Sequence, residues 1–257
     1  MTMLKKMLWI DFRRAFFNPI FWICSVANAV IYFAVCTAGV GRTINEFIIE
    51  SNLSGDLVVL CVLGSTLPFA GVFYKDYSSK FIKMLCVRSN YVYYVASKII
   101  IAVLSGGSSM VLSRVIIILF GYIKGYEDFV PDESLNYIFW STYFLEDGNV
   151  IGYFASMLLG SFLAGAFWCV LGITVSAYIP NSYVAYFIPY IVMLMEKLFN
   201  ELFEFIPDEI KIGSIWVCER VTDGLMGNLV WCISTTLIYI LIFSILFGYK
   251  VNRRISE

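Results

Sequence analysis

The chain has 257 residues, of which 60% are hydrophobic and 14% are charged, and its formal net charge is −1 at pH 7. Soluble domains are about 45–50% apolar, so a soluble domain of this length would leave much apolar surface in water. The chain has no histidine and no G-x-x-x-x-G-K-[ST] loop. We therefore expect no catalytic, cofactor or metal centre and no ATPase site within it, and the protein is predicted not to be an enzyme.

Seven cysteines are scattered along the chain without a C-x-x-C pair, and most of them lie in apolar runs. This distribution favours small packing residues over a disulfide framework or a metal site. They are Cys24, Cys36, Cys61, Cys86, Cys169, Cys218 and Cys232.

The charged residues alternate between basic and acidic segments. Residues 1–19, 75–98 and 249–257 carry twelve lysines and arginines against three acids, which are Asp11, Asp76 and Glu257. The segments between them are acidic. This alternation is typical of a multi-pass membrane protein that has its basic loops and both termini in the cytoplasm. The basic segments suit anionic lipid of the inner leaflet, and they are too short and too close to span ends for a nucleic-acid partner.

Apolar segments of about 20 residues are long enough to cross a bilayer as helices. Six qualify, so we predict an all-α membrane protein with six transmembrane helices in a single transmembrane domain over residues 1–257. Pro189, Glu196 and Lys197 interrupt the fifth segment. The predicted spans are residues 19–40, 57–74, 99–123, 150–179, 182–203 and 228–249.

Residues 3–17 precede the first span and have the pattern of an amphipathic helix lying in the membrane interface. Asn18 and Pro19 are predicted to end this helix and to start the next one, with Asn18 as the N-cap. The alternative is a first span that begins earlier. The predicted apolar face consists of Leu4, Leu8, Phe12 and Ala15, and Lys6 and Arg13 lie opposite.

The basic loop between the second and third spans contains a short predicted helix, capped by Asp76 or Ser78. Its apolar face and basic flank fit a groove in a cytoplasmic partner, and a helix lying on lipid is the alternative. The residues that would make this contact are Lys80, Phe81, Lys83, Met84, Leu85 and Arg88.

Arg114 lies near the middle of the third span, where an arginine costs about 2.5–3.5 kcal/mol on insertion scales. Glu196 is the first candidate partner, although Glu196 and Lys197 also fit the outer end of the fifth span, where they would reach water. Both Arg114 and Glu196 are candidates for a translocation path, and a structural ion pair is the alternative for Arg114.

Small residues cluster in the third and fourth spans, at spacings that let helices approach closely. We expect them to pack helices within one chain, with a subunit interface as the alternative. They are Ser105, Gly106, Gly107, Ser108 and Ser109 in the third span, and Ser156, Gly160, Ser161, Gly165 and Ala166 in the fourth.

With these features, the chain resembles the permease subunits of ABC-2 type transporters, the membrane components of bacterial ATP-binding-cassette exporters. The resemblance lies in the amphipathic residues 5–17 with the following N-P-I-F-W, and in the loop of residues 80–98 with Arg88, Tyr91 and Lys98. A long outer segment before the last span is a third likeness. The loop departs from the family pattern at Asp76, which lies one turn early, and at Val87, which replaces a proline.

The resemblance implies a subunit that pairs with a second permease copy or paralogue in the bacterial cell membrane. Each copy would dock residues 80–88 onto one of two separate ATPase subunits, and these would bind ATP and Mg²⁺. The family exports peptides, lipids, polysaccharides or drugs, and the acidic outer face favours a cationic peptide as cargo. An ion-coupled carrier and a non-transporting peptide-immunity or sensor protein are the alternative functions.

Overall fold

The computed structural model describes residues 3–36, 58–82, 90–124, 140–146, 148–203, 211–222 and 224–256. Within these ranges the chain forms helices and no β-strand, which confirms the all-α prediction. The elements are α1 (Met3–Phe16), α2 (Pro19–Cys36), η1 (Val58–Leu60), α4 (Cys61–Thr66), α5 (Val72–Ser78), α7 (Tyr91–Lys124), η2 (Trp140–Thr142), α8 (Tyr143–Glu146), α9 (Val150–Tyr178), α10 (Ser182–Phe203), α11 (Ile212–Val217) and α12 (Leu225–Ser256).

Four described helices, α7, α9, α10 and α12, are long and apolar enough to cross a membrane. They correspond to the predicted third to sixth spans. Helices α1 and α2 would make a fifth crossing if they are counted together as one span that bends by 49°. Several long apolar helices thus indicate a multi-pass membrane protein, with four to five candidate spans where the sequence predicts six.

The predicted second span, residues 57–74, is not one continuous helix in the structure, although its apolar content predicts one. Helix α4 ends at Thr66, and α5 begins only at Val72. Pro68 lies in the intervening turn, where its missing N–H prevents a regular helix from continuing. The segment packs within the bundle, with most of α4 buried, and protein surroundings tolerate such a break better than lipid does.

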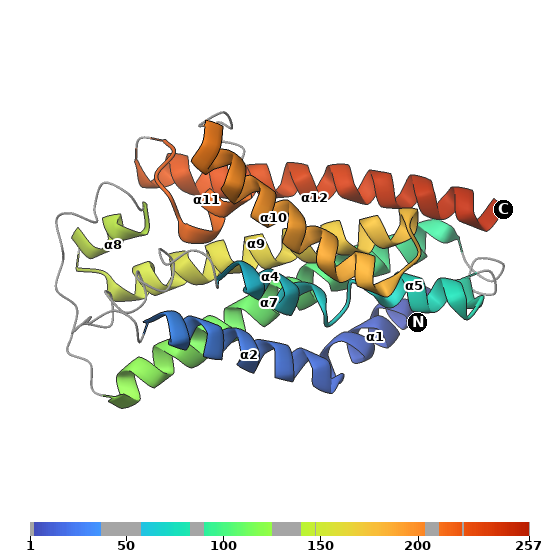
Figure 1. Ribbon diagram of the computed structural model, residues 1–257, viewed down its shortest axis with the longest axis horizontal. Coiled ribbons are helices and arrows are strands. Elements are labelled where there is room, and N and C mark those ends of the chain that lie inside the picture. The colour runs from blue at the N-terminus through green and yellow to red at the C-terminus, as the bar shows by residue number, and fades with distance from the viewer. Residues whose placement is uncertain are drawn as a thin grey trace.

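Helix α9 forms the centre of the bundle (Figure 1). Of the most apolar 18-residue stretch of each helix, 78% is buried in α9, against 11% in both α10 and α12. The backbones of α7 and α9 are in close contact where the two helices cross. A Cβ atom on Gly106 would clash with the Gly165 carbonyl, and a Cβ atom on Gly165 would clash with the Gly106 carbonyl. This confirms that the small residues pack helices within one chain.

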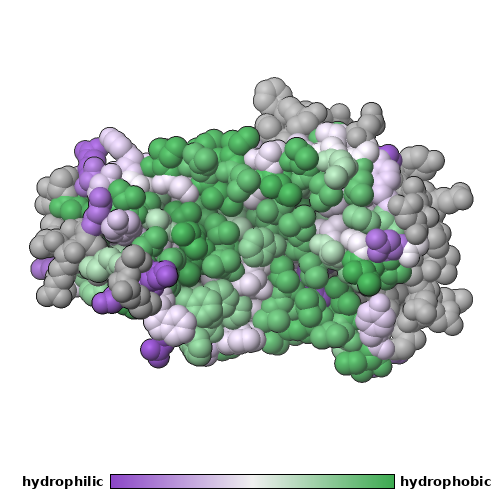
Figure 2. Space-filling view, turned by 180° about the vertical axis from the view of Figure 1, so that it is seen from behind, coloured by the Kyte–Doolittle hydropathy of each residue, from purple (hydrophilic) through white to green (hydrophobic). Residues whose placement is uncertain are grey.

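The outer surface is strongly apolar. Figure 2 shows a broad apolar band across the middle of the molecule, with hydrophilic residues gathered toward its ends. Exposed apolar side chains lie on α2, α10 and α12, and include Ile23, Val30, Phe187, Leu237, Leu241 and Ile245. A hydrocarbon environment is the one in which such a band is stable.

Both termini lie toward the same end of the bundle (Figure 1). Helix α1 begins near this end and runs away from it to Phe16, and the Asn18 side-chain oxygen accepts a hydrogen bond from the Ile20 N–H at 3.1 Å. Helix α2 then begins at Pro19. The predicted Asn18 cap and Pro19 start are therefore confirmed.

The buried face of α1 is rotated from the predicted apolar stripe. Its buried residues are Met7, Asp11 and Ala15, whereas Leu8 and Phe12 are only partly buried. The reason is that Asp11 finds charged partners inside the protein, which a helical wheel cannot indicate. The face next to it stays open, and Trp9 is 55% exposed there.

Candidate functional site

A buried cluster of charged side chains joins α1, α5 and α7 at the end of the bundle that carries the termini. The Lys98 ammonium lies 2.7 Å from Asp11 Oδ1 and 2.7 Å from Asp76 Oδ2. Arg14 Nη1 lies 2.9 Å from Asp76 Oδ1 and 3.8 Å from Asp11 Oδ1. Two carboxylates thus face two cations, and this inner charge cluster of Asp11, Arg14, Asp76 and Lys98 is neutral overall.

Three members of the inner charge cluster are almost completely excluded from solvent. Lys98 is 1% exposed, Asp76 2% and Asp11 4%. Neutral donors complete the bonding: the Tyr94 hydroxyl donates to Asp76 at 3.2 Å, and the Ser97 hydroxyl donates to Asp11 at 2.7 Å. Charges at this depth are tolerated only when they are paired and hydrogen-bonded, so the cluster holds its three helices in one arrangement.

The inner charge cluster lies directly beside the start of the predicted partner-binding segment. Helix α5 ends at Ser78, and the Lys80 N–H then donates to the Tyr77 carbonyl at 3.0 Å. Lys80 has a φ of +57°, and this left-handed turn redirects the chain after α5. The Arg14 guanidinium carbon lies 5.5 Å from the centroid of the Phe81 ring. Of the predicted contact residues, Lys83, Met84, Leu85 and Arg88 lie outside the described residues.

The C-terminal end of α12 contacts the same region from another side. Arg254 Nη2 donates to the Tyr178 carbonyl at 3.0 Å, and its guanidinium carbon lies 5.3 Å from the centroid of the Tyr77 ring. Helix α5 is therefore contacted by α1 and α7 through charges and by α12 through an arginine on an aromatic ring.

Arg114 lies further along α7, in the half of the bundle away from the termini, and is 3% exposed. Its guanidinium carbon is 3.8 Å from the centroid of the Tyr32 ring on α2, which is the geometry of a cation–π contact. Cys61, Tyr153 and Cys218 are close enough to interact with its charge. The sequence-predicted arginine is therefore buried, with the Tyr32 ring against its guanidinium.

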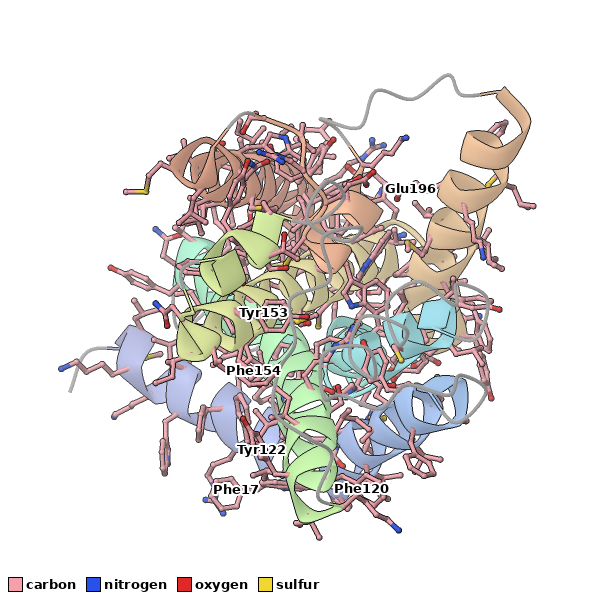
Figure 3. The ribbon with its side chains drawn as sticks, turned by 90° about the vertical axis from the view of Figure 1, so that its left-hand side faces the viewer. Phe17, Phe120, Tyr122, Tyr153, Phe154 and Glu196 are labelled. Atoms are coloured by element: carbon pink, nitrogen blue, oxygen red, sulfur yellow. The ribbon has the colours of Figure 1, made fainter. Side chains whose placement is uncertain are left out.

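Glu196 does not form an ion pair with Arg114 in the described structure. Its Oε1 atom instead accepts a hydrogen bond from the Gly213 N–H at 3.0 Å, so that it holds α10 against α11. Viewed along the bundle, Glu196 lies toward the side of the molecule, whereas Tyr153 lies near the middle (Figure 3). The pairing of Glu196 with Arg114, the first reading from the sequence, is therefore not found among the described residues, and Glu196 contacts α11.

Five cysteines, Cys24, Cys61, Cys169, Cys218 and Cys232, are buried free thiols, as expected for packing residues. Cys218 donates to the Ser156 carbonyl at 3.5 Å, and burial raises the pKa of its thiol. Among the described residues no three histidine, cysteine, aspartate or glutamate side chains gather as metal ligands.

The inner charge cluster was not predicted from the sequence, although a signal for it was present. Asp11 and Asp76 are the two acids of the first two basic segments, and Lys98 opens the third apolar segment. An acidic residue in a segment whose other charged residues are basic is a candidate for a specific ion pair. Which cation it meets depends on how α1 crosses α7, and helical periodicity does not contain that information.

The chain was compared with family models, with curated proteins and with solved structures. No family model matches it, and no curated protein or solved structure is significantly similar to it.

Proposed function

We propose that this chain is the transmembrane permease subunit of an ATP-driven exporter of the ABC-2 type. In this proposal it crosses the membrane six times, the broken segment of η1, α4 and α5 makes the second crossing, and both termini are cytoplasmic. Two copies, or one copy and a paralogue, form the translocation path. Two separate ATPase subunits bind ATP and Mg²⁺ and act on residues 80–88.

The observation that carries the proposal is the position of the inner charge cluster at the base of this segment. Asp76 lies four residues before Lys80, and it is paired with Lys98 on α7 and with Arg14 on α1. A displacement of residues 80–88 would therefore be passed to α7 through a buried charge pair and to α1 through a partly buried one.

The close α7–α9 crossing extends this connection toward the other end of the bundle. Gly106 lies eight residues beyond Lys98 on α7, and its backbone contacts Gly165 on α9. Packed backbones move as one body because interiors deform little. Movement at the cytoplasmic end would thus reach the region of Arg114, which stays a candidate for the path together with Glu196.

The cargo that we propose is a cationic peptide. The predicted outer segments are rich in aspartate and glutamate, and a surface of one charge sign concentrates ligands of the opposite sign. The proposal assigns the chain to a bacterial cell membrane, and its long apolar helices are compatible with a membrane protein.

Co-purification with the ATPase subunit tests the proposal. A Phe81→Asp, Leu85→Asp double variant should no longer retain the ATPase, because it places two charges in the apolar face that would dock. Tyr249→Asp is the matched control, since Tyr249 is an exposed aromatic residue on α12 and lies outside this segment. The control should retain the ATPase, and both variants should remain monodisperse in detergent.

An unchanged ATPase complex in the double variant would refute docking through residues 80–88. Two further experiments separate the alternative functions. Solute movement in liposomes that contain the purified chain without an ATPase, driven by an ion gradient alone, would identify a carrier. Protection of cells from a peptide without any movement of that peptide would identify an immunity protein.

A further inference from the structure

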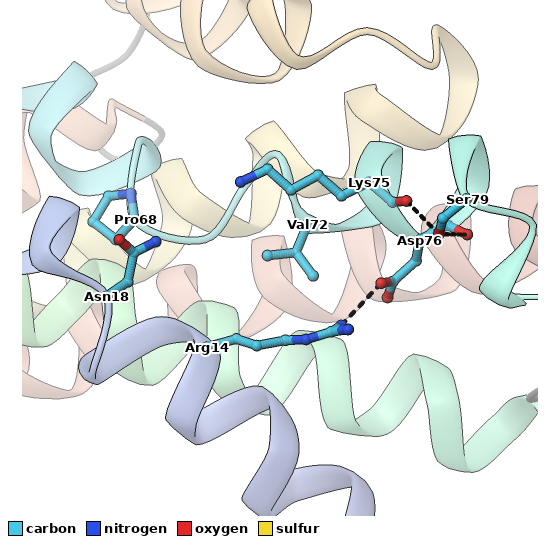
Figure 4. A pocket seen from close by; sticks show the side chains of 7 residues that line it. All are labelled: Arg14, Asn18, Pro68, Val72, Lys75, Asp76 and Ser79. Atoms are coloured by element: carbon cyan, nitrogen blue, oxygen red, sulfur yellow. Dashed lines mark hydrogen bonds and ion pairs between the residues drawn. The ribbon is translucent and has the colours of Figure 1, made fainter.

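An open cavity of about 300 Å³ lies next to the inner charge cluster, between the end of α1 and α5. Its lining residues are Arg14, Asn18, Pro68, Val72, Lys75, Asp76 and Ser79. Figure 4 shows the Lys75 side chain extended across Val72 toward Pro68 and Asn18. Charged and apolar groups therefore share one recess at the end of the molecule where the termini lie.

The cavity carries a surplus positive charge. Asp76 is the acid in its lining, and it is already bound by Lys98 at 2.7 Å, by Arg14 at 2.9 Å and by the Tyr94 hydroxyl at 3.2 Å. Asp11 is the second carboxylate of the inner charge cluster and pairs with Lys98. The two carboxylates together balance the charges of Arg14 and Lys98. Among the described residues no carboxylate lies within ion-pair distance of Lys75, so its ammonium group is the uncompensated charge.

Hydrogen-bond donors accompany this charge. The Asn18 side-chain oxygen is occupied by the Ile20 N–H, which leaves the amide NH₂ as a donor next to the cavity. The guanidinium of Arg14 bonds Asp76 through Nη1, and its side chain is 40% exposed. The recess thus combines an ammonium, a guanidinium and an amide donor, which together suit a phosphate group.

The remaining walls of the cavity are apolar. Pro68 and Val72 line the cavity beside Lys75, and α1 next to it carries exposed apolar residues such as Trp9 and Ile10. A ligand that fills the recess therefore needs an anionic phosphate next to an apolar part.

We propose that this cavity binds the phosphate of an anionic phospholipid from the cytoplasmic leaflet, with Lys75 as the main charge contact. A lipid that touches α1, the turn at Pro68 and α5 together would stabilise the arrangement of these three parts. The proposal rests on a cytoplasmic position for the end of the bundle that carries both termini, which is part of the proposed function. It does not depend on transport or on an ATPase.

Retention of lipid by the purified chain tests this site. Delipidated protein is incubated with vesicles of phosphatidylglycerol or phosphatidylcholine, returned to detergent, and analysed by native mass spectrometry. The unmodified chain should retain phosphatidylglycerol preferentially. Lys75→Gln should lower this retention about five-fold, since a basic residue near anionic lipid contributes on the order of 1 kcal/mol.

Two further variants isolate the contribution of Lys75. Lys75→Arg keeps the charge and should restore retention, and Lys250→Gln removes one charge from α12 at the same end of the molecule and should change retention little. Equal retention by Lys75→Gln and the unmodified chain, or equal loss in both glutamine variants, would overturn the proposal.

Inorganic phosphate serves as the probe for a soluble ligand. If phosphate alone raises the unfolding temperature in detergent and Lys75→Gln abolishes this effect while phosphatidylglycerol is not retained, the ligand is a free phosphate and the lipid proposal fails. These measurements use the chain without an ATPase, so their outcome is independent of the docking experiment.

Discussion

Two buried cations on the same helix are accommodated in different ways. Lys98 and Arg114 both lie on α7, sixteen residues apart, which is about 24 Å along a helix at 1.5 Å per residue. Lys98 is held between two carboxylates, each at 2.7 Å. Arg114 lies on the face of the Tyr32 ring, 3.8 Å from its centroid.

The comparison shows how the chemistry of a cation matches its surroundings. A lysine ammonium is a compact, strongly hydrated charge, and burial requires that anions and donors replace its water. A guanidinium is planar and more weakly hydrated, so an aromatic face compensates it well. The lysine position joins α1, α5 and α7 by charge, whereas the arginine position joins α7 to α2 through an aromatic ring.

The largest effect is expected when the charge balance around Lys98 is broken. Lys98→Met leaves Asp11 and Asp76 buried with Arg14 as their remaining cation, and should lower the free energy of unfolding by about 3–5 kcal/mol. Thermal unfolding in detergent measures this as a lower midpoint and a loss of monodisperse protein.

The double variant Lys98→Met, Asp11→Asn restores one carboxylate to one cation and serves as the control. It should be more stable than Lys98→Met alone, because Asp76 keeps Arg14 at 2.9 Å. A double variant that is less stable than the single one would show that the cluster acts through packing and not through charge.

A smaller effect is expected at Tyr32, whose aromatic ring lies against the Arg114 guanidinium. Tyr32→Leu removes the ring beneath Arg114 and should lower the free energy of unfolding by about 3 kcal/mol, part of it from the lost cation–π contact and the remainder from packing. Tyr32→Phe keeps the ring and should change stability by less than about 1 kcal/mol. Similar losses in the two variants would mean that the hydroxyl, and not the ring, supports Arg114.

The smallest effect is expected for the coupling between Arg114 and Glu196. Glu196 binds the Gly213 N–H, and in the described residues no ion pair joins it to Arg114. In a double-mutant cycle with Arg114→Met and Glu196→Gln, the interaction free energy should therefore be below about 0.5 kcal/mol. A coupling above 1 kcal/mol would reinstate Glu196 as the partner of Arg114.

Several features of the fold were predictable because they depend on short stretches of sequence. The Asn18 cap and the Pro19 helix start follow from backbone chemistry that one or two residues control. The third to sixth spans follow from apolar length, and α10 spans Ser182–Phe203 as predicted, even with Pro189 inside it. The small residues at Gly106 and Gly165 indicated a close helix crossing.

The second predicted span shows what apolar length does not specify. Residues 57–74 are apolar enough to count as one span, yet α4 and α5 are separate helices on either side of Pro68. Apolar content measures the preference of a segment for lipid, whereas its backbone path depends on the neighbours that satisfy broken hydrogen bonds. Those neighbours come from distant parts of the chain.

Composition and charge order were sufficient to establish an apolar helical bundle with a basic end, because partition into lipid depends on residue type and segment length alone. The meeting of Asp11, Asp76 and Lys98 was decided only by tertiary packing. These residues are separated by 65 and 22 positions in the chain, and their contact depends on how α1 and α5 dock onto α7. Helix crossing is set by side-chain shape over the whole interface, so no local pattern records it.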